Sequence, residues 1–101
     1  MIDRGYVIVC RNERVGRLEI DIIARTGATL VFCEVRARRT DRWGSPAESI
    51  AGDKANRIRR AAAGWLAEHK PRTSRIRFDA AAVVMEGANG EPEVTYYENA
   101  F

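Results

Sequence analysis

Acidic side chains stand inside two otherwise apolar stretches of this 101-residue sequence. The first stretch, LEIDIIA, carries Glu19 and Asp21, and the second, TLVFCEVR, carries Glu34 and Arg36. Side chains two residues apart on a strand point to the same face of a sheet. If the two stretches pair as a hairpin, Asp21 lies opposite Glu34 and Glu19 lies opposite Arg36. One face then holds three carboxylates and one guanidinium.

Such a cluster is unfavourable unless something positive lies within it. Two carboxylates about 5 Å apart repel each other by roughly 3 kcal/mol at an effective dielectric constant near 20, and like charges directly opposite each other weaken strand pairing. Two hard oxygen ligands, from Asp21 and Glu34, suit Mg²⁺ or Mn²⁺. The alternative interpretation is an ordinary ion-pair network in which Arg36 neutralises the carboxylates.

A small number of elements must position these side chains. Apolar residues at helical spacing predict one long helix from Asp53 to about His69, and polar residues predict a turn over 12–16. Runs of β-branched and aromatic residues predict five strands, at residues 6–11, 18–24, 29–36, 75–85 and 94–99. The first three are close enough for an antiparallel meander, and the helix should connect the third to a parallel fourth. The prediction is a single α/β domain over 1–101 with a mixed sheet, in the order β-β-β-α-β-β.

The formal net charge of +3 conceals an uneven distribution. Residues 1–35 carry five basic and five acidic side chains, and residues 78–101 carry five acidic and no basic ones. Residues 36–77 carry twelve basic and only four acidic side chains. A basic block of this kind favours a polyanionic partner such as nucleic acid, although a solvated helix face would have a similar composition.

Six basic side chains are candidates for phosphate contacts, which give salt-dependent and sequence-independent binding. Trp43, within the same basic segment, could stack on an exposed base or belong to the core. The six follow the third predicted strand or step along one side of the helix: Arg38, Arg39, Arg42, Lys54, Arg57 and Arg60.

Several function classes have no support in the sequence. No apolar run approaches the ~20 residues of a membrane helix, and no signal-peptide pattern is present. Cys10 and Cys33 lack metal-ligand spacing and form no disulfide framework, so both are expected to be free thiols in a cytoplasmic protein. His69 has no partner at ligand spacing, and there is no glycine-rich phosphate loop.

An ordered set of short motifs resembles the YraN family, a group of small bacterial proteins similar to archaeal Holliday junction resolvases. Asp21 and Glu34-Val35-Arg36 resemble the D…(D/E)xK signature of the PD-(D/E)XK nuclease superfamily. Further similar stretches cover nearly the whole chain: Gly5-Tyr6, Arg11-Asn12, 19–24, 30–36, 44–48, Lys54, Ala61-Ala62, Arg77-Phe78-Asp79 and 99–101.

The resemblance implies a restriction-endonuclease-like core and a metal-dependent phosphodiesterase. Asp21, Glu34 and the carbonyl of Val35 would hold Mg²⁺ or Mn²⁺, which lowers the pKa of bound water and offsets charge on the phosphate. Arg36 would stabilise the attacking water and the phosphate. Glu19 would be a further ligand or would orient Arg36.

Two features depart from the family pattern. Arg36 stands where the family has lysine, and arginine keeps the charge but cannot act as a base. The family usually has a helix before the Gly-Tyr strand, and only residues 1–4 precede that strand here, so we expect this helix to be missing.

The expected function is therefore a Mg²⁺- or Mn²⁺-dependent endonuclease acting on branched or flap DNA, with a homodimer as one assembly it could form and no membrane partner. One alternative is a catalytically weak or inactive module that binds nucleic acid. Another is a protein-binding domain whose nuclease-like face is vestigial.

Overall fold

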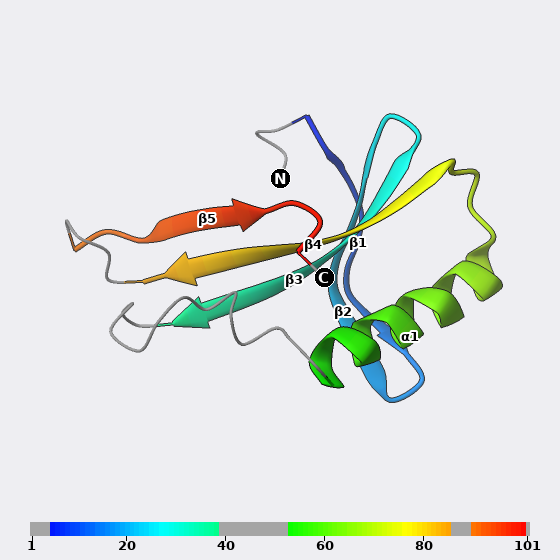
Figure 1. The fold of residues 1–101 in the computed structure, drawn as a ribbon, viewed down its shortest axis with the longest axis horizontal. Coiled ribbons are helices and arrows are strands. Elements are labelled where there is room, and N and C mark those ends of the chain that lie inside the picture. The colour runs from blue at the N-terminus through cyan, green and yellow to red at the C-terminus, as the bar shows by residue number, and fades with distance from the viewer. Residues whose placement is uncertain (1–4, 39–52, 86–89, 101) are drawn as a thin grey trace.

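A five-stranded mixed sheet with one long helix forms the described part of the chain. The computed structural model describes residues 5–38, 53–85 and 90–100 (Figure 1). The strands lie side by side in sequence order, and all neighbours are antiparallel except β3 and β4, which are parallel. The α/β class and the mixed sheet are thus confirmed. The elements are β1 (Val7–Val15), β2 (Leu18–Thr26), β3 (Thr29–Arg38), α1 (Asp53–His69), β4 (Arg75–Val84) and β5 (Glu93–Tyr97).

The first strand is longer than its composition predicted. The expected turn over 12–16 is wrong, because β1 continues to Val15 and the chain turns at Gly16 and Arg17. The reason is packing against α1, since Val15 lies against the helix-side core and the Glu13 carboxylate accepts a hydrogen bond from Trp65 Nε1 at 3.3 Å. The other polar residues of this stretch, Asn12 and Arg14, are exposed, as an edge strand allows.

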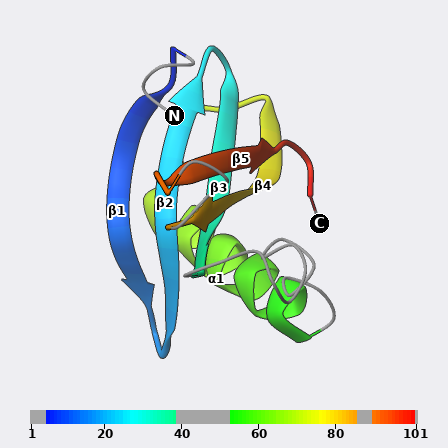
Figure 2. The ribbon, with the colours of Figure 1, turned by 90° about the vertical axis from the view of Figure 1, so that its left-hand side faces the viewer.

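The helix covers one face of the sheet (Figures 1 and 2). The apolar residues at helical spacing face the sheet as predicted, because Leu66 is half-buried and the other four are buried: Ala55, Ile58, Ala62 and Trp65. At Gly64 the helix comes so close to β1 that a β-carbon would lie 2.8 Å from Val15 Cγ1. The main core lies between the two layers and consists of Ile20, Ile23, Leu30, Phe32, Ala61, Ala62 and Trp65. Both cysteines are free thiols, as predicted.

The opposite face of the sheet carries a polar network centred on Asp79, a fully buried carboxylate. Arg77 donates two hydrogen bonds to it, from Nε and NH2, each of 2.8 Å. The Tyr96 hydroxyl and the backbone N–H of Asn99 also donate to the same carboxylate. A further bond from Arg77 to the Tyr6 hydroxyl connects the start of β1 to this network. A buried carboxylate is tolerated only with such complete pairing.

Removal of the Asp79 carboxylate should destabilise the whole sheet, because it leaves Arg77 without its main partner. We expect Asp79→Ala to lower the free energy of unfolding by about 3 kcal/mol or more, measured by urea denaturation, and Asp79→Asn to give a smaller loss if the alanine variant does not fold. The control is Glu98→Ala, because the Glu98 side chain is 53% exposed and lies 3.9 Å from Arg77. An exposed pair contributes about 1 kcal/mol or less, so equal losses in the two variants would contradict the network.

Candidate metal centre and basic surface

The candidate centre lies where β2 and β3 stop pairing. Their register runs from Thr26–Thr29 to Ile22–Cys33, which is the hairpin register that the sequence predicted. Just beyond the last pair, the Val35 N–H donates to Asp21 Oδ2 at 2.8 Å. In a regular sheet, a backbone carbonyl of β2 would accept the hydrogen bond from Val35. Here the Asp21 side chain accepts it instead. Asp21 and Glu34 therefore meet through their side chains, just beyond the last paired residues of β2 and β3.

The alternation of β2 changes at the same place. Ile20 and Ile23 both pack into the helix-side core, whereas a regular strand would send them to opposite faces. Asp21 borders a hollow with Ile22, which packs on the face away from the helix, and Glu34 borders a hollow with Ile58 of α1. Asp21 lies at this change in alternation, and its side chain contacts that of Glu34.

The charges of the predicted residues converge on Glu34. The pKa of its carboxyl is raised from 4.5 to about 7, first by burial and then by the negative charge of Asp21 and a hydrogen bond with Asp21. Arg36 lowers the pKa of Glu34, and Glu19 raises it slightly. All four residues that the sequence singled out thus interact electrostatically, with Asp21 and Glu34 in direct contact.

Arg36 brings a guanidinium to the carboxylate pair. Its Nε is buried and has no hydrogen-bond partner within the described residues. A buried donor without a partner costs about 1–3 kcal/mol, so such a group is suited to binding a ligand oxygen. Arg36 is half-buried beside Glu34, which places this donor at the carboxylate pair.

The donor set of the centre consists of hard oxygens. Across residues 5–38, 53–85 and 90–100, no group of three or more His, Cys, Asp or Glu side chains could hold a metal ion. An ion at Asp21 and Glu34 would need further oxygens from a backbone carbonyl, such as that of Val35, and from water. Mg²⁺ commonly binds in this way, through one or two carboxylates and several waters.

A small hollow gives access to Glu34 from the helix side. It has a volume of about 200 Å³ and is lined by Arg17, Leu18, Glu19, Glu34, Arg57 and Ile58. Arg17 is not among the predicted site residues; it lies in the turn directly before β2, two residues before Glu19. The carboxylates are thus bordered by two arginines at this opening.

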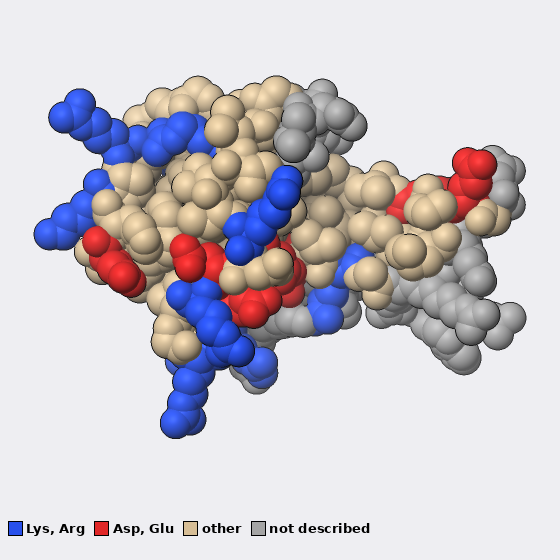
Figure 3. Space-filling view, turned by 180° about the vertical axis from the view of Figure 1, so that it is seen from behind, with Lys and Arg blue, Asp and Glu red and all other residues tan. Residues whose placement is uncertain are grey.

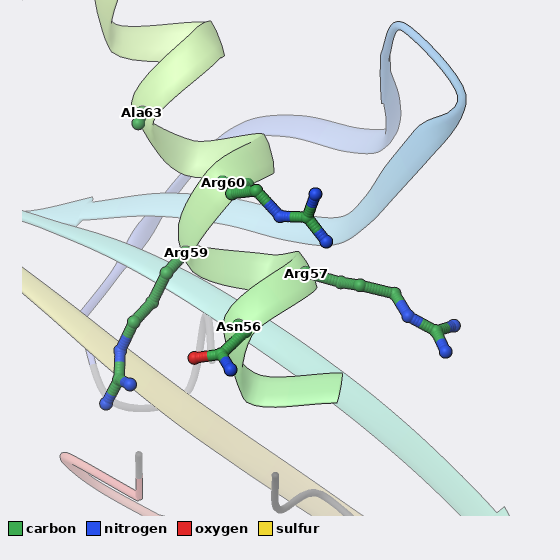
Figure 4. A pocket seen from close by; sticks show the side chains of 5 residues that line it. All are labelled: Asn56, Arg57, Arg59, Arg60 and Ala63. Atoms are coloured by element: carbon green, nitrogen blue, oxygen red, sulfur yellow. The ribbon is translucent and has the colours of Figure 1, made fainter. Parts of the chain in front are cut away.

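A basic groove continues from the hollow along the exposed side of α1. It has a volume of about 660 Å³ and is lined by Asn56, Arg57, Arg59, Arg60 and Ala63. Arg57 and Arg60 extend to the same side of the helix, as predicted, and Arg59 extends to the other side (Figure 4). Arg57 lines both the hollow at Glu34 and this groove, so it connects the acidic centre to the basic surface.

Acidic and basic side chains lie together on the surface. A view from the side opposite to Figure 1 shows a group of acidic side chains with basic side chains around it (Figure 3). Of the other predicted basic residues, Arg38 ends β3 and Lys54 lies in the first turn of α1. Arg39 and Arg42 lie outside the described residues.

Fold and centre together define a small α/β protein with a carboxylate pair at a strand junction. The chain belongs to the uncharacterised protein family UPF0102, whose sequence pattern it matches over residues 1–83. This result confirms the predicted YraN family.

Relatives cover most of the chain. A UPF0102 protein of Frankia alni is 52% identical over 79 residues, which are 78% of this chain and 66% of that protein. A UPF0102 protein of Frankia casuarinae is 44% identical over 96% of this chain and 81% of its own length. One from Rhodococcus opacus is 39% identical over the full chain and 85% of its own length. No helix among the described residues is long and apolar enough to cross a membrane.

The raised pKa of Glu34 predicts a pH dependence of stability. Between its ordinary pKa of 4.5 and about 7, the folded chain holds a proton that the unfolded chain has lost, so the free energy of unfolding falls as pH rises through this window. Solvent screening limits the loss to roughly 1–3 kcal/mol.

Glu34→Gln, which resembles the protonated acid, should remove this decline. Urea denaturation between pH 4 and 8 should show the glutamine variant equal to the wild type at the acidic end and more stable at the neutral end. Glu68→Gln, at an exposed position of α1, is the control and should keep the wild-type slope. Parallel curves for wild type and Glu34→Gln would contradict the raised pKa.

Proposed function

We propose that this chain is a metal-dependent phosphodiesterase with a restriction-endonuclease-like core, acting on branched or flap DNA. One observation carries the proposal: Asp21 and Glu34 are held in contact where β2 and β3 separate, with the Val35 N–H bonded to Asp21. Two like charges in contact gain from a cation, and their oxygens are the ligands that Mg²⁺ and Mn²⁺ prefer.

Asp21, Glu34 and the Val35 carbonyl would hold the divalent ion. When bound, such an ion lowers the pKa of its water and neutralises charge on phosphate oxygens. The bond from Val35 fixes the orientation of the Asp21 carboxylate beside Glu34. Glu34 must lose its proton to bind a cation, and its raised pKa makes this binding stronger as pH rises through about 7.

Arg36 would supply fixed positive charge to the phosphate. Its guanidinium stays protonated and offers a planar set of donors that matches phosphate oxygens, and its buried Nε has no partner in the described residues. Charge that grows on a phosphate during hydrolysis is stabilised by donors already in place. Glu19, which is exposed and acts electrostatically on Glu34, would be a further ligand or would orient Arg36.

DNA would bind through the basic groove of α1. Arg57, Arg59 and Arg60 line an open depression of about 660 Å³, and Arg57 also borders the carboxylate centre. Contacts of this kind are made to the phosphate backbone and carry no base sequence. They suit a substrate that is recognised by its shape.

A second candidate function is binding without cleavage. Arg36 favours it, because an arginine cannot accept a proton as a lysine can. In that case Asp21 and Glu34 would still bind a cation, and the groove on α1 would still bind DNA.

The phosphodiesterase proposal predicts cleavage of four-way-junction or flap DNA in Mg²⁺ or Mn²⁺. Because both metal ligands are needed, Asp21→Ala and Glu34→Ala should each lower the cleavage rate at least about 100-fold. Glu68→Ala, which removes an exposed carboxylate of α1, is the matched control. Mn²⁺ should raise the melting temperature of the wild type and of the control, but not of the two site variants.

The outcomes separate the two candidate functions. Salt-sensitive binding without cleavage supports the binding module and contradicts the phosphodiesterase. Absence of binding at low salt contradicts both. Arg36→Lys tests whether arginine limits the rate, because a lysine should raise cleavage if proton transfer at this position matters.

The groove predicts which arginines contribute to DNA affinity. Arg57→Gln and Arg60→Gln should each weaken binding of junction DNA and lower the slope of log affinity against log salt by about 1. Fluorescence anisotropy across a salt series measures both quantities. Arg72→Gln, an exposed arginine of the loop before β4, is the control and should match the wild type. Equal effects at all three positions would indicate nonspecific attraction to net charge.

A further inference from the structure

β1 is distorted at Asn12, directly across from the proposed metal ligand Asp21. The strand pairs Arg11 with Ile22 and Glu13 with Ile20, and it passes over Asn12 and Asp21 between them. Asn12 has φ of 50°, in the left-handed region that strands do not use. Two neighbouring strands thus depart from regular geometry at the same level of the sheet.

Packing around Asn12 shows the same change. Cys10, Glu13 and Val15 all lie toward the helix, since two pack on its core and Glu13 bonds Trp65. A regular strand would place residues 10 and 13 on opposite faces. The left-handed residue lies between them and accounts for this difference, without a shift in the register with β2. Non-glycine residues in this region cost of order 1 kcal/mol and cluster at functional sites.

The distortion forms one wall of a hollow. The hollow has a volume of about 330 Å³ and is lined by Arg11, Asn12, Asp21, Ile22 and Val35. It lies on the face away from α1, because Ile22 packs against the cluster of Tyr6, Ala24 and Val31. The carboxylate pair is therefore bordered by two hollows, this one at Asp21 and the helix-side one at Glu34.

The lining combines two kinds of surface. Ile22 and Val35 are half-buried and apolar, whereas Arg11 and Asn12 are exposed and offer a guanidinium and an amide. A nucleotide has matching parts, because its sugar is largely apolar at the carbon edge and its phosphate is anionic. The volume is at the lower end of the range for small-molecule sites, about 300–1,000 Å³, which suits a single nucleotide.

We propose that this hollow is a subsite for one nucleotide of the nucleic acid, with its sugar against Ile22 and Val35 and its phosphate held by Arg11 and Asn12. The inference rests on the proposed function and extends it, since it places substrate on both sides of the carboxylate pair. The Arg11 guanidinium and the Asn12 amide would counter the repulsion between the Asp21 carboxylate and that phosphate.

Nuclear magnetic resonance with thymidine 3′,5′-bisphosphate tests the subsite without any need for cleavage. In the ¹⁵N-labelled chain with Mg²⁺, the probe should shift the Asn12 side-chain amide and the backbone amides of Ile22 and Val35. Arg11→Gln should weaken binding of the probe about threefold to tenfold. Arg14→Gln, the same change at an exposed position of the same strand, is the control and should bind as the wild type does.

Asn12→Gly separates a binding role from a backbone role. Glycine adopts positive φ freely, so the melting temperature should stay equal or rise while binding of the probe is lost. Asn99→Gly, at another asparagine with positive φ (54°), controls for this backbone effect. Unchanged binding in Asn12→Gly would overturn the subsite.

The subsite and the proposed reaction can fail separately. If the wild type cleaves DNA but saturating bisphosphate shifts none of these amides, the subsite is wrong and the phosphodiesterase stands. If the bisphosphate shifts them and Asn12→Gly abolishes the shifts, the subsite stands even when no DNA is cleaved.

Discussion

The bond from the Val35 N–H to the Asp21 carboxylate determines the geometry of the whole centre. β2 and β3 stop pairing after Ile22 and Cys33, and a strand that loses its partner leaves backbone groups that must be satisfied. Here a side chain satisfies one of them. The same bond brings Asp21 against Glu34, whose pKa rises to about 7 because the two carboxyl groups are close and partly buried. The end of pairing between β2 and β3 and the raised pKa of Glu34 therefore occur together, at the Val35–Asp21 bond.

Packing on one face of the sheet and hydrogen bonds on the other stabilise the fold against the unfavourable interactions at this centre. On one face, Phe32 packs between Trp65 and Phe78 and holds α1 on the sheet close to the separation point. On the other face, the Asp79 network joins β1, β4 and the chain after β5. Like charges in contact and a non-glycine residue at positive φ each cost free energy. Both lie between these two well-packed regions, where surrounding contacts prevent the strands from relaxing.

Local patterns predicted much of the fold and the identity of the central residues. The turn at Gly27 and Ala28 fixed the register of β2 and β3, so Asp21 and Glu34 could be paired by counting. The break at Asn12 and Asp21 could not be predicted, because it depends on how β1 and β2 pack against a helix distant in sequence. The Asp79 network was missed for the same reason, since its partners lie up to 71 residues apart. Arg17 could not be singled out by charge, because it lies before the acidic strands in a segment of zero net charge, whereas the basic block follows them.

An arginine suits position 36, because this side chain is half-buried beside the carboxyl of Glu34. A half-buried lysine beside a desolvated carboxyl would have its pKa lowered by burial, whereas a guanidinium keeps its charge in such surroundings. A permanent cation offsets part of the charge of Asp21 and Glu34 at every pH, and the effect is seen in the lowering that Arg36 exerts on the pKa of Glu34. The same permanence prevents Arg36 from accepting a proton. Its contribution to any reaction at this centre is therefore charge and hydrogen-bond geometry, and a proton acceptor must be found among other groups.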